Sequence, residues 1–190
     1  MILVWAVLIG FLAALLRFRK QVFLRLGNIQ LHSTWLVLLA IGLQIPLLRQ
    51  PAGPPAELLF EKTSFFISFL LLLAFVCLNR GLLGAWEAGM GIFMNLVVIL
   101  ANGGLMPITP QTLVIINPGS QVEEWQSGDH YPFSKDVILA SQDTRLQILS
   151  DTLALPWPLP RRAAFSLGDI FLAVGIVIFF MDIPVMVKKP

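Results

Sequence analysis

Seven polar residues stand out in an otherwise apolar chain and could form one site. They comprise two amides, three acids, one hydroxyl and one cation: Asn95, Asn102, Asp143, Arg145, Asp151, Ser166 and Asp169. A carboxylate can act as a general acid or base, and an arginine can hold an anionic headgroup through its planar fork. Ionisable groups are costly in an apolar environment, so residues of this kind are a functional hypothesis by default.

Structural roles compete with each of these assignments. Ser166 and Asp169 have the spacing of a helix capping box, with Asp in place of the usual Glu or Gln. We favour that capping role over a functional one. Arg145 could bridge Asp143 or Asp151, or hold a phosphate or carboxylate, and an internal salt bridge is the interpretation we favour.

No motif in the chain names a reaction. There is no G-x-S-x-G, no phosphate-binding Gly-Lys loop and no H-E-x-x-H, and His32 and His130 lie far apart. The single cysteine, Cys77, excludes an internal disulfide framework or thiolate cluster. We therefore expect no metal site and no cofactor, and no catalytic residue is identified.

Composition places the chain in a membrane. Of its 190 residues, 57% are hydrophobic and 13% are charged, and the mean hydropathy is +0.82. These values lie well outside the usual range for a soluble domain. A net charge of only +2 leaves no basic patch for nucleic acid. We expect membrane lipids, and other membrane subunits, as partners.

Five apolar runs predict an all-α fold, a polytopic helix bundle in one integral membrane domain over residues 1–190. Each run is close to the length of about 17 to 25 residues that a spanning helix needs. The predicted helices are residues 1–16, 33–48, 63–78, 82–101 and 163–187, with a partly ordered outer loop over 102–160. Arg17 and its basic neighbours follow the first run, so we interpret that run as an anchor and not as a cleaved signal.

The positions of Lys and Arg predict the orientation. Cytoplasmic loops are enriched in these residues. They follow the first, third and fifth runs at Arg17, Arg19, Lys20, Arg25, Arg80, Lys188 and Lys189. We therefore expect a multi-pass protein of the bacterial inner membrane with its N-terminus outside and its C-terminus in the cytoplasm. Arg161 and Arg162, just before the last run, count against this orientation.

Small residues recur on three of the predicted helices, where they would permit close helix contact. The first helix has Ala6, Gly10 and Ala14, the fourth has Gly84, Ala88, Gly91 and Asn95, and the fifth has Gly168 and Gly175. We expect these three helices at the centre of the bundle, although such stripes also arise by chance.

Two shorter segments are also expected to be helical. Phe18, Val22, Phe23, Leu26 and Ile29 follow a helical period beside basic residues, as in an amphipathic segment on the membrane surface that ends at Gly27-Asn28. Thr109-Pro110 is typical of the N-cap and first position of a helix through about residue 116.

Four motifs together resemble a known family. They are Ala101-Asn102-Gly103-Gly104-Leu105-Met106-Pro107, Asp143-Thr144-Arg145-Leu146, Leu149-Ser150-Asp151 and Ser166-Leu167-Gly168-Asp169. The chain resembles an uncharacterised family of small bacterial multi-helix membrane proteins, a domain of unknown function. The chain departs from that pattern at Ser150, where glycine is expected. The resemblance implies a bacterial inner-membrane location and no established activity.

Two functions follow as hypotheses. The first is a non-enzymatic accessory or assembly subunit of a larger membrane complex. The alternative is a small lipid-handling enzyme or transporter with an outward-facing polar pocket. A pocket predicts that the polar motifs converge on an open cavity. A subunit predicts that they satisfy one another in closed hydrogen bonds and leave an apolar flank exposed.

Overall fold

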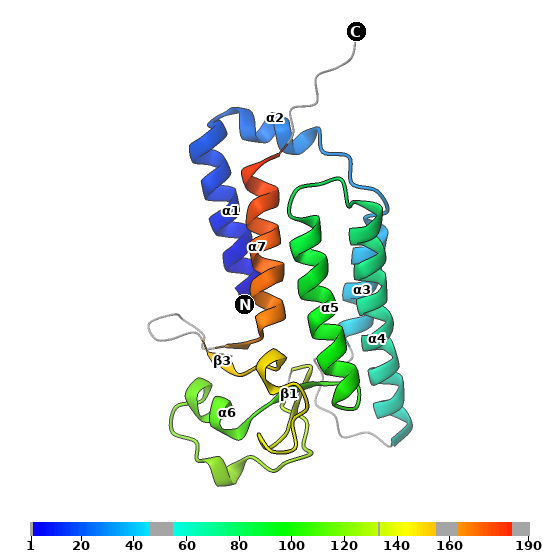
Figure 1. Ribbon diagram of the computed structural model, residues 1–190, viewed down its shortest axis with the longest axis vertical. Coiled ribbons are helices and arrows are strands. Elements are labelled where there is room, and N and C mark those ends of the chain that lie inside the picture. Colours follow the sequence, from blue (N-terminus) through cyan, green and yellow to red (C-terminus); the bar gives the residue numbers. More distant parts are fainter. Residues whose placement is uncertain (1, 46–54, 133, 155–162, 184–190) are drawn as a thin grey trace.

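Apolar helices dominate the computed structural model, which describes residues 2–45, 55–132, 134–154 and 163–183 (Figure 1). Five of them lie side by side: α1 (Ile2–Phe18), α3 (Trp35–Gln44), α4 (Pro55–Leu78), α5 (Ala85–Ala101) and α7 (Leu167–Met181). Contacts join α1 to α7, α7 to α5, α5 to α4 and α4 to α3. The last helix of the sequence is therefore inserted between the first helix and α5.

Every predicted apolar run contains a helix, but the bounds differ for local reasons. α4 begins earlier than residue 63, because its first turns mix three charged residues with apolar ones and so do not continue the apolar run. α5 begins after Gly84, whose φ of 83° ends a turn. α7 begins at Leu167 and not at residue 163, because the preceding residues are extended and Ser166 caps the helix. The predicted positions 46–48 and 184–187 lie outside the described residues.

Helix length singles out α4. Within the described chain, its stretch Leu59–Leu78 is the one helix long and apolar enough by itself to cross a bilayer, with a mean hydropathy of 1.9. α1 and α2 (Gln21–Gly27) meet the same criterion as a pair but are bent by 120°. α3, α5 and α7 are apolar and shorter. By length and composition, the described residues thus contain one helix that could cross a membrane. There are two if α1 and α2 together form a single bent span.

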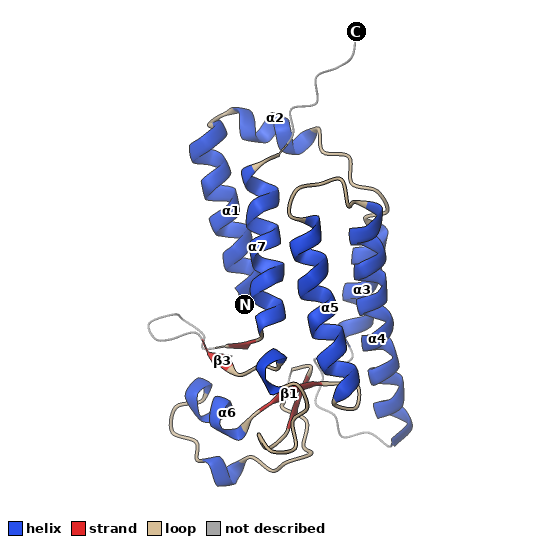
Figure 2. Cartoon of the chain, viewed as in Figure 1, coloured by secondary structure: helices blue, strands red, loops and turns tan. Residues whose placement is uncertain are grey.

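Two small sheets correct the all-α expectation (Figure 2). β1 (Met106–Ile108) pairs in parallel with β2 (Asp136–Ile138), and β3 (Leu153–Ala154) pairs antiparallel with β4 (Ala164–Phe165). We name residues 102–154 the outer segment. Short buried apolar triplets such as β1 can satisfy their backbone groups without a helix, which the apolar pattern alone did not distinguish.

The outer segment packs onto the bundle through a hydrophobic cluster that the two share. Leu105 and Met106 are buried against Phe65 and Ile99 of α4 and α5. A second cluster within the segment contains Ile108. The helix α6 (Pro110–Ile116) begins as predicted, with Thr109 Oγ1 accepting from the Thr112 amide. Two turns of 3₁₀ helix, η2 (Val122–Glu124) and η3 (Gln147–Leu149), complete the segment.

The opposite end of the bundle is covered by α2, at the top of Figure 1. The predicted helix and its end at Gly27-Asn28 are confirmed there: Val22 is fully buried and Asn28 is the C-cap, whereas Phe23 is exposed. Arg17 donates to the carbonyl of Met181 at 2.7 Å, and Arg25 donates to the carbonyl of Ile183 at 3.0 Å. Arg17 therefore satisfies the last carbonyl of α7 and Arg25 a carbonyl just beyond it, and their charge suits the negative end of the helix dipole.

Glycines set the distance between α5 and α7. A Cβ atom on Gly91 would lie 2.6 Å from the amide nitrogen of Leu172, and one on Gly175 would lie 2.5 Å from that of Ala88. The predicted small-residue stripes thus face each other, as expected for closely packed membrane helices. α5 and α7 lie inside the row of helices, whereas α1 is at its edge, which corrects its expected central position.

A larger side chain in this contact should destabilise the protein. We expect Gly91→Leu to lower the free energy of unfolding by at least about 1 to 3 kcal/mol, because backbone atoms of α7 cannot move aside as a side chain can. The measurement is thermal unfolding in detergent by circular dichroism. Gly42→Ala in α3 is the matched control, since nothing lies within 4 Å of its Cβ position. Equal unfolding temperatures for both variants would contradict the proposed close contact.

Candidate functional site

A polar cluster lies where the outer segment meets α5 and the start of α7. Four of the seven residues expected from the sequence contribute to it, together with two that were not expected: Asn95, Asp151, Ser166 and Asp169 with Lys135 and Asp136. Asn95 lies on α5, Ser166 and Asp169 lie at the N-terminus of α7, and Lys135 and Asp136 lie at the start of β2. Asp151 is bridged to Ile108 of β1. Segments far apart in the sequence therefore supply one site.

Ser166 and Asp169 form the predicted capping box. The Asp169 amide donates to Ser166 Oγ at 3.0 Å, and the Ser166 amide donates to Asp169 Oδ2 at 3.4 Å. Ser166 is fully buried. The bonds satisfy amides that the first turn leaves open, and the acid lies at the positive end of the helix dipole. The structural role favoured from the sequence is confirmed.

Asn95 adds a contact between helices that capping alone does not provide. Its Nδ2 donates to Asp169 Oδ1 at 2.8 Å, and its Oδ1 accepts from Ser166 Oγ at 2.8 Å. Gly168 permits this approach, because a Cβ there would collide with the Asn95 amide. The three side chains close a hydrogen-bonded triad between α5 and α7.

Asp151 and Asp136 lie on either side of β1 in the outer segment. Asp151 forms a parallel bridge with Ile108, and its amide donates to the carbonyl of Pro107 at 3.1 Å. Asp136 pairs with Met106 at the start of β2. The exposed fractions are 3% for Asp151 and 8% for Asp136. In each carboxyl, Oδ1 is buried without a hydrogen-bond partner among the described residues.

Lys135 supplies the positive charge near these acids. Burial alone would lower the pKa of Lys135, but the negative charges of Asp151, Asp169 and Asp136 outweigh burial and raise its pKa. Lys135 therefore stays protonated at neutral pH. Among the described residues, Lys135 forms no ion pair in direct contact with an acid. The ion pair found in this part of the chain joins Arg17 to Asp182.

Burial determines the protonation of the acids. It raises the pKa of Asp151 to about 8, and the Lys135 charge only partly opposes this effect. Burial raises the pKa of Asp136 as well, again with Lys135 opposing. Desolvation disfavours a carboxylate, so a proton is retained. At neutral pH, Asp151 is therefore mainly a neutral carboxylic acid that can bind and release a proton near physiological pH.

The other three expected residues lie apart from this cluster. Asn102 Nδ2 donates to the Arg145 carbonyl at 2.8 Å, and Asn102 Oδ1 accepts from the Arg145 amide at 2.8 Å. The side chains of Asp143 and Arg145 are exposed. The expected salt bridge of Arg145 with Asp143 or Asp151 is not formed among the described residues. Asn102 recognises the backbone of the D-T-R-L motif and not its charges.

Lys135 and Asp136 were missed because the sequence places them in a polar stretch, where charges are ordinarily solvated. One signal was available: the two charges immediately precede the apolar run Val137-Ile138-Leu139. A charged pair at the start of a buried strand is held near the core into which that strand packs.

In the described residues, no group of three His, Cys, Asp or Glu side chains is arranged to hold a metal ion.

Comparison with known proteins identifies relatives without a known activity. A family of unknown function, DUF5317, matches residues 28–181. An uncharacterised protein of Thermotoga maritima is 28% identical over 124 residues, and this alignment covers 65% of the chain and 66% of the relative, just under two thirds. No solved structure matches the chain.

Removal of the Asn95 amide should weaken the contact between α5 and α7. We expect Asn95→Ala to lower the free energy of unfolding by about 1 to 3 kcal/mol, since Asp169 and Ser166 lose buried partners. A double-mutant cycle with Ser166→Ala, followed by thermal unfolding in detergent, measures the coupling. A coupling energy above about 0.5 kcal/mol is expected for residues in contact. Strict additivity would contradict the triad.

Protonation of Asp151 predicts a pH dependence of stability. Its pKa is about 8 in the folded protein and about 4 in an unfolded chain. The folded state therefore binds this proton more tightly than the unfolded chain does. The stabilisation of the folded state by proton binding to Asp151 is complete below pH 4 and is lost as the pH rises towards 8. The pKa of Asp136 is also raised by burial, so its effect on stability has the same direction.

The test is thermal unfolding in detergent from pH 5 to 9. We expect the wild type to lose at least about 1.4 kcal/mol, the equivalent of one pKa unit, across this range. Asp151→Asn mimics the neutral acid and should remove most of the loss. Asp143→Asn, at an exposed acid, is the matched control and should leave it intact. A wild-type slope in Asp151→Asn would contradict the assignment.

Proposed function

This chain belongs to the DUF5317 family, and we propose that it is a non-enzymatic integral membrane protein that serves as an accessory subunit of a larger membrane complex. In this proposal, α1, α3, α4, α5 and α7 are the membrane-embedded helices, and the outer segment covers one end of the bundle. The observation that carries it is the contrast between closed polar contacts at that end and an open apolar groove on the flank of the helices.

Four of the polar candidate residues are hydrogen-bonded within the fold, as expected of a structural protein. Asn95, Ser166 and Asp169 use their side chains on each other, and Asn102 is used on the backbone of Arg145. A substrate site needs polar groups that are free to converge on a ligand. Four of the seven candidate residues are therefore already committed to interactions within the fold.

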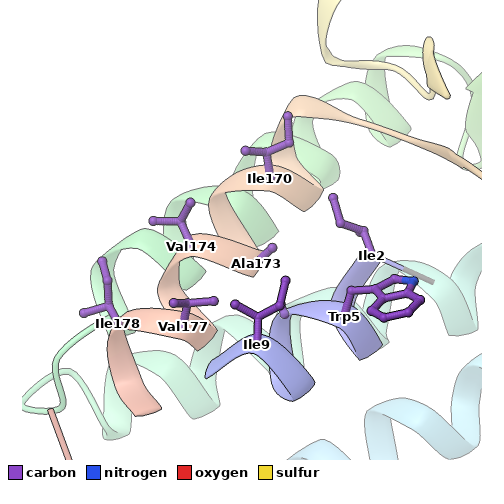
Figure 3. A pocket seen from close by; sticks show the side chains of 9 residues that line it. Ile2, Trp5, Ile9, Ile170, Ala173, Val174, Val177 and Ile178 are labelled. Carbon is purple, nitrogen blue, oxygen red and sulfur yellow. The ribbon is translucent and has the colours of Figure 1, made fainter. Parts of the chain in front are cut away.

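An apolar groove of about 280 Å³ runs between α1 and α7 (Figure 3). Nine residues line it, all of them nonpolar or aromatic: Ile2, Trp5, Ala6, Ile9, Ile170, Ala173, Val174, Val177 and Ile178. Apart from the indole N–H of Trp5, no lining side chain carries a hydrogen-bonding group, and such a groove suits an apolar partner. Small residues at its base, such as Ala173, permit the close approach that helices in a bilayer use. We assign this groove to a transmembrane helix of a partner subunit.

Exposed apolar side chains support membrane embedding of all five helices. Leu12 of α1, Leu38 of α3 and Phe93 of α5 are each more than half exposed. Soluble monomers seldom expose apolar patches of such extent. The 17 residues of α1 or α5 rise about 26 Å, which approaches the hydrocarbon core of about 30 Å. Snorkelling and local thinning of the bilayer can cover the difference.

The distribution of charge supports the orientation with the N-terminus outside. Arg19, between α1 and α2, and Arg80, just after α4, belong to the α2 end of the bundle. Two hydrogen bonds between His32 and Asn79 join the turn after α2 to the turn after α4 at this end. Basic residues are enriched on the cytoplasmic side. We therefore place the α2 end in the cytoplasm and the outer segment outside, in a bacterial inner membrane.

A second candidate function is the handling of a lipid or solute at the outer surface. One observation favours it: Asp136 and Asp151 are buried beside Lys135, and each has an unpartnered oxygen. Perturbed acids of this kind are candidates for proton transfer. Arg145, the expected headgroup ligand, makes no ion pair with them among the described residues.

Purification of the tagged protein in a gentle detergent tests the subunit proposal. Mass spectrometry should identify a membrane protein partner at constant stoichiometry. Ala173→Phe, which fills the groove, should reduce the recovered partner at least about tenfold, a loss of about 1.4 kcal/mol in binding. Ala74→Phe on the exposed face of α4 is the matched control. A protein that migrates alone with one enriched lipid or metabolite would overturn the proposal in favour of the second candidate.

A further inference from the structure

The short helix α2 lies across one end of the bundle and not along it. The chain turns by 120° between α1 and α2. Val22 is fully buried, in a cluster with Ala14 of α1 and Ile183 beyond α7. The inward side of α2 is therefore fixed to the bundle, and its other side is presented outward at the level where α1 ends (Figure 1).

The outward side of α2 combines apolar and basic residues. Phe23 is 63% exposed and Leu24 is 70% exposed. Arg19 and Lys20, immediately before the helix, are also exposed. We name these four residues the α2 face. Apolar side chains beside cations are typical of a surface that enters the boundary between headgroups and acyl chains.

The basic residues at this end of the molecule divide into two pairs. Arg17 binds the last carbonyl of α7, and Arg25 binds the carbonyl of Ile183 just beyond it and lies over the Phe18 ring at 3.9 Å. The side chains of Arg19 and Lys20 have no partner within the described residues. The first acidic residue of the sequence is Glu57, so α1 and α2 supply no negative charge to neutralise them.

The backbone at Arg19 adds an independent observation. Its φ of 51° lies in the left-handed region, which costs a residue with a Cβ about 1 kcal/mol or more and which glycine adopts freely. The turn geometry therefore favours glycine, yet the position carries a long cationic side chain. A strained non-glycine residue is a reason to look for a function of its side chain.

We propose that the α2 face binds anionic phospholipids of the bilayer in which the protein is embedded. Arg19 and Lys20 contact the headgroup phosphates, and Phe23 and Leu24 insert below them into the acyl region. The positive charge of the face, without a neighbouring acid in α1 or α2, selects anionic over zwitterionic headgroups. This inference rests on the membrane placement proposed above, because α1 in the bilayer brings the α2 face to the level of the headgroups.

Lipid analysis of the full-length protein tests the proposal. The protein is exchanged into mixed micelles of phosphatidylcholine and phosphatidylglycerol in equal amounts, and retained lipids are counted by mass spectrometry. We expect phosphatidylglycerol to be enriched, and the enrichment to fall about fivefold for each cation that is neutralised and to weaken at high salt. The test variant is the double substitution Arg19→Gln and Lys20→Gln.

Two controls keep the result interpretable. Arg145→Gln removes an exposed cation at the opposite end and should retain the enrichment. Unchanged circular dichroism of the double variant excludes misfolding, since neither side chain makes a contact within the described residues. Equal enrichment in the double variant and the wild type would overturn the proposal, as would equal retention of phosphatidylcholine and phosphatidylglycerol by the wild type.

Carbonate extraction of native membranes separates this proposal from the proposed function. Protein that remains in the pellet supports integral membrane placement whatever its lipid preference. Protein that is released would overturn that placement. In that case, co-sedimentation with phosphatidylglycerol vesicles, compared with phosphatidylcholine vesicles, tests the α2 face separately. Equal binding to both kinds of vesicle would then overturn the lipid proposal as well.

Discussion

The close approach of α5 and α7 is the constraint on which the other features of the structure depend. Glycines on both helices leave no side chain between the two backbones, so the helices meet at main-chain distance. This distance lets the short Asn95 side chain reach Ser166 and Asp169 directly. Because Asn95 and Ser166 are buried, these hydrogen bonds are stronger than they would be in water, and they specify the register of the two helices as well as their contact. A helix from the end of the sequence is thereby placed in the middle of the bundle.

The position of α7 in turn brings the outer segment to the polar cluster. β4 leads directly into α7 and pairs with β3, which follows Asp151 by one residue. The acid is therefore held beside the helix start by backbone pairing and not by its own side chain. Its burial follows from that position and explains its retained proton. The same geometry places Lys135 near several acids without an ion pair in direct contact among the described residues.

The two ends of α7 are stabilised by opposite charges. Asp169 lies at its N-terminus, and at its other end Arg17 binds the carbonyl of Met181 and Arg25 that of Ile183, just beyond the helix. Both placements suit the helix dipole. Between the ends, the helices expose apolar side chains and α7 shares an apolar groove with α1. Charged ends and an apolar middle are consistent with the membrane placement we propose, in which polar groups gather at the two interfaces.

Several local features could be predicted from the sequence alone because each depends on neighbouring residues. The capping box at Ser166, the start of α6 at Thr109-Pro110 and the end of α2 at Gly27-Asn28 are set by contacts within a few positions. The five apolar helices could also be predicted from the sequence, as could the stripes of small residues on α5 and α7. The periodicity along a single helix is enough to show which residues share a face.

Only the tertiary structure decided which polar residues share a site. Asn95 and Asn102 lie one heptad apart on the same helix, yet one reaches α7 and the other the backbone of Arg145. Lys135 and Asp136 joined the cluster because β2 pairs with β1, a contact between residues about 30 positions apart in the chain. The small sheets and the burial of Asp151 have the same origin. Sequence periodicity determines which faces are apolar, whereas the meeting of distant segments depends on packing and backbone pairing that no local pattern encodes.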